Sequence, residues 1–184
     1  MDYANEIALV GQARDDPLAF VTLYERYVER IFGFVYRRTH DEMLASDITS
    51  ATFEKALHSI RRYQWRGISF GAWLYRIARN EIAQHYRHQI VLPLPTRYPT
   101  TLDVEQTVQS NQQRDSLYVA LAKLSDSDQE LITLRYFETL SNAEVASILG
   151  CSVDNVYLRL HRALGRLRKH LEQLDYSEVI YVQE

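Results

Sequence analysis

Aromatic and basic side chains gather around one glycine in the first half of the sequence. Tyr63 and Trp65 precede Gly67, and Phe70 follows it. Arginines are interleaved with them, at positions 61, 62 and 66. Aromatic faces can stack on unpaired bases while guanidinium groups bind phosphates, so this combination suits single-stranded nucleic acid. Because glycine allows the backbone to turn sharply, we expect a loop here.

A basic track continues beyond this loop. Its members are Arg76, Arg79, Asn80 and Arg87, which recur at about three- and four-residue spacing. That spacing places them on one side of a helix. We expect Tyr63 and Trp65 to face a ligand because they lie outside the apolar stripe. Phe70 and Trp73 fall on that stripe and are expected to be core residues.

A second pattern lies near the other end of the sequence. Ser141 and Glu144 form a capping box at the start of a short helix that stops at Gly150, and Ser152 then begins a second helix. The polar face of that helix is expected to hold Ser152, Asp154, Asn155, Tyr157, Arg159, Arg162 and Arg166. A short helix, a glycine turn and a longer basic helix are typical of the helix-turn-helix. An ordinary helical hairpin with a solvated basic face is the alternative.

Position along the second helix predicts different roles for its polar residues. Asn155 lies in the first turn, where an amide can pair with base edges in the major groove. Arg162 and Arg166 lie two or more turns further on, where phosphates are the expected partners. The sequence therefore predicts that Asn155 sets the base preference and that the later arginines add affinity.

Amphipathic helices must position these residues, because apolar side chains recur at helical spacing through most of the chain. Three stripes run over residues 20–35, 44–60 and 70–86. Residues 92–113 interrupt the pattern with three of the four prolines, which predicts an extended linker. We therefore expect an all-α protein with two small helical domains joined by a flexible linker. The expected segments are an N-terminal extension or short helix (1–15), a first domain (16–90), a linker (91–113), a second domain (114–172) and an acidic tail (173–184).

Composition excludes several classes of protein. The net charge of −3 argues mildly against nucleic-acid binding, but the basic residues are clustered in the two segments described above. Cys151 is the sole cysteine, so there is no internal disulfide, and we expect it to be structural, with a redox switch as the alternative. His85 and His88 lack a third ligand in register, and we expect no metal and no cofactor.

Catalytic and membrane motifs are also missing from the sequence. It has no glycine-rich phosphate loop and no Gly-x-Ser-x-Gly motif, so we do not expect an enzyme. It has no apolar run of about 18 residues, and residues 1–11 carry no signal pattern. We therefore expect a soluble, cytoplasmic protein without membrane insertion.

Three segments resemble one family. Residues 73–81, Trp-Leu-Tyr-Arg-Ile-Ala-Arg-Asn-Glu, resemble the second conserved region of the sigma-70-type RNA polymerase sigma factors, and specifically of the extracytoplasmic-function group. Residues 45–53 resemble that family's Asp-Leu-Val-Gln-Glu-Thr-Phe segment, although Ser50 and Ala51 stand in place of Gln-Glu. Residues 124–171 resemble its fourth conserved region. Asp154-Asn155 replace the usual Gly-Thr there, which implies an unusual promoter preference.

The resemblance implies roles for all of these residues. Core RNA polymerase, through its beta and beta-prime subunits, is expected to bind Asp47, Ile48, Thr52 and Phe53. The −10 element of promoter DNA is expected to bind Arg62, Tyr63, Trp65, Arg66, Arg76, Arg79, Asn80 and Arg87. The −35 element is expected to bind the polar face of the second helix of the helix-turn-helix. The resemblance also allows an anti-sigma factor as a partner.

Two other functions remain open from the sequence. A helix-turn-helix transcription regulator that acts without being a polymerase subunit would explain the C-terminal half, but not residues 73–81. A nucleic-acid-processing enzyme would need a clustered acidic triad or a histidine-containing catalytic motif, and the sequence offers neither.

Overall fold

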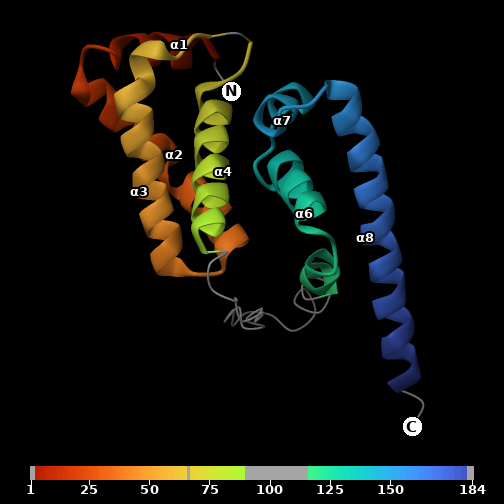
Figure 1. Cartoon of the computed structure of the whole chain (residues 1–184). Coiled ribbons are helices and arrows are strands. Elements are labelled where there is room, and N and C mark those ends of the chain that lie inside the picture. Colours follow the sequence, from red (N-terminus) through yellow and green to blue (C-terminus); the bar gives the residue numbers. More distant parts are fainter. Residues whose placement is uncertain (1–2, 66, 90–115, 182–184) are drawn as a thin grey trace. The chain divides into compact units, whose positions relative to one another are not determined.

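The computed structural model describes residues 3–65, 67–89 and 116–181 (Figure 1). Every regular element in these ranges is a helix, and none is a strand, which confirms the prediction of an all-α protein. Internal contacts divide the chain into two compact units: residues 1–99 with 143–152, and residues 100–142 with 153–184. The expected linker, residues 91–113, lies outside the described residues.

The first unit is built from helices α1 to α4. Their bounds are α1 Tyr3–Gln12, α2 Pro17–Thr39, α3 Glu42–Ser59, the 3₁₀ turn η1 Ile60–Arg62, and α4 Phe70–Gln89. Two aspartates begin the long helices, because Asp16 accepts a hydrogen bond from the amide of Leu18 and Asp41 from that of Leu44, both at 2.9 Å. Such N-caps satisfy amides that the helix itself leaves unpaired.

The core of this unit lies where α2, α3 and α4 pack against one another (Figure 1). The apolar stripes that the sequence predicts supply most of it. Its largest fully buried side chains are Tyr27, Tyr75, Phe34, Phe70, Leu23, Ile31, Leu74 and Val35. Burying side chains of this size contributes roughly 1.5–3 kcal/mol each, so these contacts hold the helices at fixed positions.

The C-terminal part of the chain continues with a helical segment at residues 116–122, then α6 Asp126–Ile132, the π-helix η2 Thr133–Phe137, α7 Asn142–Leu149 and α8 Val153–Tyr181. In the second unit, Leu124, Ile132 and Ala163 form a small apolar core between α6 and α8. Helix α8 continues beyond Leu174 to Tyr181, so most of the segment expected to be a tail is helical.

Helices α2 and α4 approach each other closely at Gly71. A Cβ atom at this position would lie 2.7 Å from Cε1 of the buried Tyr27 ring. The absence of a side chain at Gly71 therefore allows the two helices to pack at this distance.

We predict that Gly71→Ala destabilises the first unit by about 1–3 kcal/mol, because the ring of Tyr27 must be displaced within a packed core. Gly11→Ala is the matched control, since a Cβ there meets no heavy atom within 4 Å. The control should be neutral or stabilising by up to about 1 kcal/mol. Urea unfolding followed by circular dichroism measures both, and equal midpoints for the two variants would contradict the prediction.

Candidate nucleic-acid interface

A pocket of about 280 Å³ opens between α3, η1 and α4. It is lined by Lys55, Ser59, Arg62, Tyr63, Trp73, Ile77, Asn80 and Glu81. The lining combines aromatic rings, cationic groups and one amide, which together can stack on a planar ring, bind a phosphate and pair with a polar edge. Three of the residues singled out in the sequence, Arg62, Tyr63 and Asn80, meet here.

Tyr63 is more structural than the sequence suggests. It is only 8% exposed, and its ring packs against Phe70 and Trp73 with centroids 5.6 and 5.2 Å away. Its hydroxyl donates a hydrogen bond to the carbonyl of Ile68 at 2.9 Å, which closes the loop that contains Gly67. Burial, reinforced by the Glu6 carboxylate, raises the pKa of Tyr63 well above its usual range, so the phenol stays neutral and keeps this bond. Tyr63 thus forms part of the pocket wall while supporting the loop.

The two tryptophans compare differently with expectation. Trp65, in the loop, is 36% exposed and presents part of its indole to solvent, and that it faces a ligand stays a prediction. Trp73 was expected to be core, yet it is only partly buried and lines the pocket. Its place in the helical stripe does not indicate this position, because the same stripe also supplies the core residues Phe70 and Leu74.

The remaining residues of the basic track lie on α4. Arg76, Asn80 and Arg87 are exposed, and Arg79 is half-buried. Lys55 was missed by the sequence analysis; it reaches across from α3 to form an ion pair with Glu81 at 2.6 Å at the edge of the pocket. Arg66 lies outside the described residues.

The face of α3 that was expected to bind polymerase needs correction. Asp47 is exposed, but Ile48, Thr52 and Phe53 are buried inside the first unit. The Thr52 hydroxyl donates to the carbonyl of Ile48 at 2.7 Å, and Phe53 packs edge-on against Tyr24. These three residues hold α3 in place and do not form an outer surface.

A different set of α3 residues shares the exposed face with Asp47. These residues are Met43, Ser46, Ser50, Glu54 and Leu57. Met43 and Leu57 are large apolar side chains open to solvent. The exposed face of α3 therefore combines acidic and apolar groups.

The turn between α7 and α8 has the geometry that the sequence predicts. Gly150 has a φ of +69°, in the left-handed region that favours glycine. The amide of Cys151 donates to the carbonyl of Ala146 at 3.0 Å, which is the hydrogen bond of a Schellman helix end. Helix α8 then begins at Val153, directly after Ser152. Cys151 itself is half-buried in this turn.

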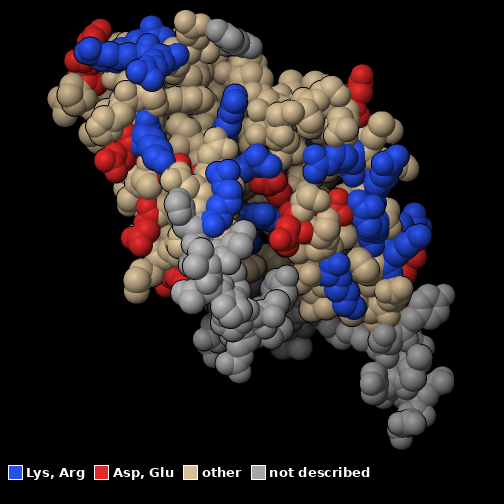
Figure 2. All heavy atoms as spheres, viewed as in Figure 1, with Lys and Arg blue, Asp and Glu red and all other residues tan. Residues whose placement is uncertain are grey.

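The expected recognition face of α8 is open to solvent. Val156, Leu160 and Ala163 are buried on one side of the helix. The exposed residues are Ser152, Asp154, Asn155, Tyr157, Arg162 and Arg166, and Arg159 is half-buried. Figure 2 shows Lys and Arg side chains gathered along α8. This basic helix face is therefore available for a polyanion.

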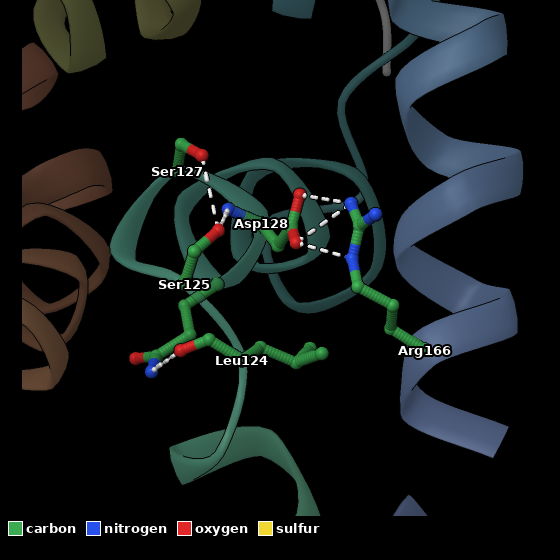
Figure 3. Close-up of polar contacts among 6 residues, drawn as sticks. Leu124, Ser125, Ser127, Asp128 and Arg166 are labelled. Carbon is green, nitrogen blue, oxygen red and sulfur yellow. Dashed lines mark hydrogen bonds and ion pairs between the residues drawn. The ribbon is translucent and has the colours of Figure 1, made fainter. Parts of the chain in front are cut away.

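Arg166 also has an internal partner. Its Nε donates to Oδ2 of Asp128 at 2.8 Å and its Nη2 to Oδ1 at 2.9 Å, a bidentate ion pair that joins α8 to α6 (Figure 3). The Asp128 side chain is 8% exposed and that of Arg166 is 49% exposed. The amide of Asp128 donates to the Ser125 hydroxyl, which caps α6. The contact of Arg166 with phosphate stays a prediction. Its ion pair with Asp128 gives it a structural role between α8 and α6.

Other kinds of site are not found in the part of the chain that the structure describes. No three His, Cys, Asp or Glu side chains in these ranges come together in a way that could hold a metal ion. No helix among the described residues has the length and apolar character needed to cross a membrane.

Comparison with known proteins gives consistent matches over both parts of the chain. Residues 23–89 match the model of Sigma-70 region 2, and residues 114–167 match that of Sigma-70, region 4. The RNA polymerase sigma factor YlaC of Bacillus subtilis is 33% identical over 165 residues, covering 86% of this chain and 95% of YlaC. The ECF RNA polymerase sigma factor BldN of Streptomyces coelicolor is 32% identical over 177 residues, covering 90% of this chain and 67% of BldN.

A solved structure is similar as well. The chain of CnrH, from its structure in complex with the cytosolic domain of CnrY, superimposes with a TM-score of 0.69 at 25% identity. The match covers 91% of this chain and 97% of that chain.

The Asp128–Arg166 pair predicts that two arginines of α8 differ in how much they contribute to the stability of the second unit. Arg166→Ala should destabilise the second unit by about 1–3 kcal/mol, because it leaves a buried carboxylate without its donor. Arg162→Ala removes an exposed guanidinium from the same helix and should change stability by less than about 0.5 kcal/mol. Differential scanning calorimetry measures both variants. An unchanged melting temperature for Arg166→Ala would show that the ion pair does not stabilise α6 against α8.

Proposed function

Because the chain belongs to the extracytoplasmic-function subfamily of the sigma-70-type RNA polymerase sigma factors, we propose a division of promoter recognition between its residues 16–90 and 114–172. As a sigma factor it directs promoter recognition and transcription initiation. We propose that it acts as a subunit of the polymerase in the cytoplasm and is not itself an enzyme.

The first segment binds the −10 element and keeps its strands apart. The pocket between α3, η1 and α4 carries this proposal, since a partly exposed Trp73, an exposed Arg62 and an exposed Asn80 border one small cavity. A base that leaves the duplex loses its stacking partners, and an aromatic wall replaces them. Arg62 then binds the adjacent phosphate, and Asn80 pairs with the edge of the base. Trp65, in the neighbouring loop, stacks on a second unpaired base.

The second segment reads the −35 element of duplex DNA through α8. The first turn of this helix offers Asp154 and Asn155, whose side chains are of the right size and polarity to reach base edges in the major groove. Tyr157, Arg159 and Arg162 follow along the helix and bind the sugar-phosphate backbone. The exposure of this face supports the proposal.

Core RNA polymerase binds the exposed face of α3, through its beta and beta-prime subunits. Asp47 provides a charge and Met43 and Leu57 provide apolar contacts on this face. An anti-sigma factor is a further partner that membership of the family allows. Such a partner would control the chain by covering the surfaces that polymerase needs.

Run-off transcription with purified core polymerase and a pool of genomic promoter fragments tests the function as a whole. Discrete transcripts that depend on both the core enzyme and this protein are the expected result. A protein that protects duplex promoter DNA without polymerase, and gives no transcripts with it, would instead be a free-standing helix-turn-helix regulator.

For the −10 site, we predict that Trp65→Ala and Asn80→Ala slow opening of a duplex promoter. Loss of the stacking of Trp65 on a base costs about 1–3 kcal/mol, which corresponds to roughly five- to 150-fold. Loss of the contact between Asn80 and a base edge costs about the same. A template mismatched over the −10 element should show a smaller defect, because its strands are already apart. Tyr118→Ala removes an exposed aromatic ring from another part of the chain and serves as the control. Normal opening by both variants on duplex DNA would remove this assignment.

For the polymerase-binding face, we predict that Asp47→Arg weakens binding of core polymerase while the melting temperature stays the same, because Asp47 is exposed. Reversing a charge at an interface typically costs 2 kcal/mol or more, roughly thirtyfold in affinity. Glu25→Arg, an equivalent change on the exposed face of α2, is the control. Titration of labelled protein with core enzyme measures the affinity, and equal affinities for the two variants would contradict the proposal.

A further inference from the structure

The C-terminal end of the Gly67 loop is held by a residue of helix α1. Glu6, on α1, is 4% exposed, and its Oε2 accepts a hydrogen bond from the backbone amide of Phe70 at 3.1 Å. Phe70 is the first residue of α4. The other carboxylate oxygen of Glu6 accepts a hydrogen bond from the hydroxyl of Tyr27 on α2. A carboxylate at this place both satisfies an unpaired amide and interacts favourably with the positive end of the helix.

The start of the same loop is held by the turn that follows α1. Nη2 of Arg14 donates to the carbonyl of Tyr63 at 2.7 Å. In return, Nε of Arg61 donates to the carbonyl of Arg14 at 3.1 Å. The ion pair between Arg61 and Asp15 is almost fully exposed and adds little. The N-terminal segment therefore contacts the backbone on both sides of residues 64–69.

We propose that residues 3–16 form a clamp that fixes the loop bearing Trp65 in the conformation required for binding unpaired promoter bases, with Glu6 and Arg14 as the positioning residues. The proposal rests on the function of the loop proposed above. It adds that the geometry of the loop is set in part by residues outside the loop and outside the segment that matches Sigma-70 region 2, which begins at residue 23.

The two contacts have different physical weights. Glu6 is buried, so removing a partner or replacing its carboxyl group changes a site from which water is excluded. Arg14 is exposed, and its substitution leaves the core of the unit intact. Both act on backbone atoms at the loop ends, so the identity of the loop side chains does not alter them. A loop held at both ends loses less conformational entropy when DNA orders it.

The experiment uses full-length protein assembled with core polymerase. Glu6→Gln and Arg14→Ala are compared with Ile31→Val, which removes one methylene-sized group from the buried core of α2 and serves as a control for general destabilisation. Hydrogen exchange measured by mass spectrometry follows the amides of residues 64–70 in the free protein. Promoter opening is measured on the duplex and on the template mismatched over the −10 element.

Both clamp variants should speed exchange at residues 64–70 and slow opening of the duplex by about tenfold, with core affinity unchanged. Ile31→Val should do neither beyond its effect on stability. Unchanged exchange in both clamp variants, or opening no slower than in Ile31→Val, would overturn the clamp. If the clamp variants are slow but Trp65→Ala opens DNA normally, the clamp stands and the role proposed for Trp65 is wrong. Should Glu6→Gln fail to fold, Arg14→Ala decides the outcome alone.

Discussion

One buried carboxylate connects three helices of the first unit. Glu6 accepts hydrogen bonds from the hydroxyl of Tyr27 on α2 and from the amide of Phe70 on α4. Burial, together with the hydrogen bond to Glu6, raises the pKa of Tyr27 well above its usual range, so this donor is permanent under ordinary conditions. The bare backbone of Gly71 lets the Tyr27 ring lie against α4. A polar group in this position stays buried only while its hydrogen-bond partners are in place, so the positions of α1, α2 and α4 depend on one another. The geometry of the pocket and of the loop that contains Gly67 therefore depends on how these helices are held.

Much of the local structure follows from short stretches of sequence. Helix α2 begins where Asp16 precedes Pro17, and α7 ends where Gly150 allows a left-handed residue, because such signals act within a few positions along the chain. The apolar stripe on α2 predicts its buried residues well, although Tyr24 is open to solvent. The sequence also predicts the exposed face of α8. Helical periodicity alone places Val156 and Leu160 on the buried side and Asn155 and Arg162 on the exposed side.

Contacts between residues that lie far apart in the sequence could not be predicted from such local patterns. The match of Thr52 and Phe53 to a family segment indicates that they matter, but only packing reveals that they face inward. The pairing of Arg166 with Asp128, 38 positions away, has no local pattern. Glu6 reads as an ordinary acidic residue in a short N-terminal helix, because its partners come from two other helices. Periodicity places Trp73 on the inner side of α4, and only the neighbouring elements decide that a pocket opens there.

The Asp128–Arg166 pair also bears on how binding of DNA by α8 should respond to ionic strength. Each phosphate that a protein neutralises releases condensed counterions, and the logarithm of the binding constant then falls with the logarithm of salt concentration by about 0.9 per phosphate. A guanidinium already neutralised by an internal carboxylate displaces few counterions. Helix α8 thus has fewer charges to exchange with DNA than a count of its arginines suggests. Its contacts should retain more of their strength in concentrated salt, with a larger share of the binding free energy coming from uncharged groups such as Asn155 and Tyr157.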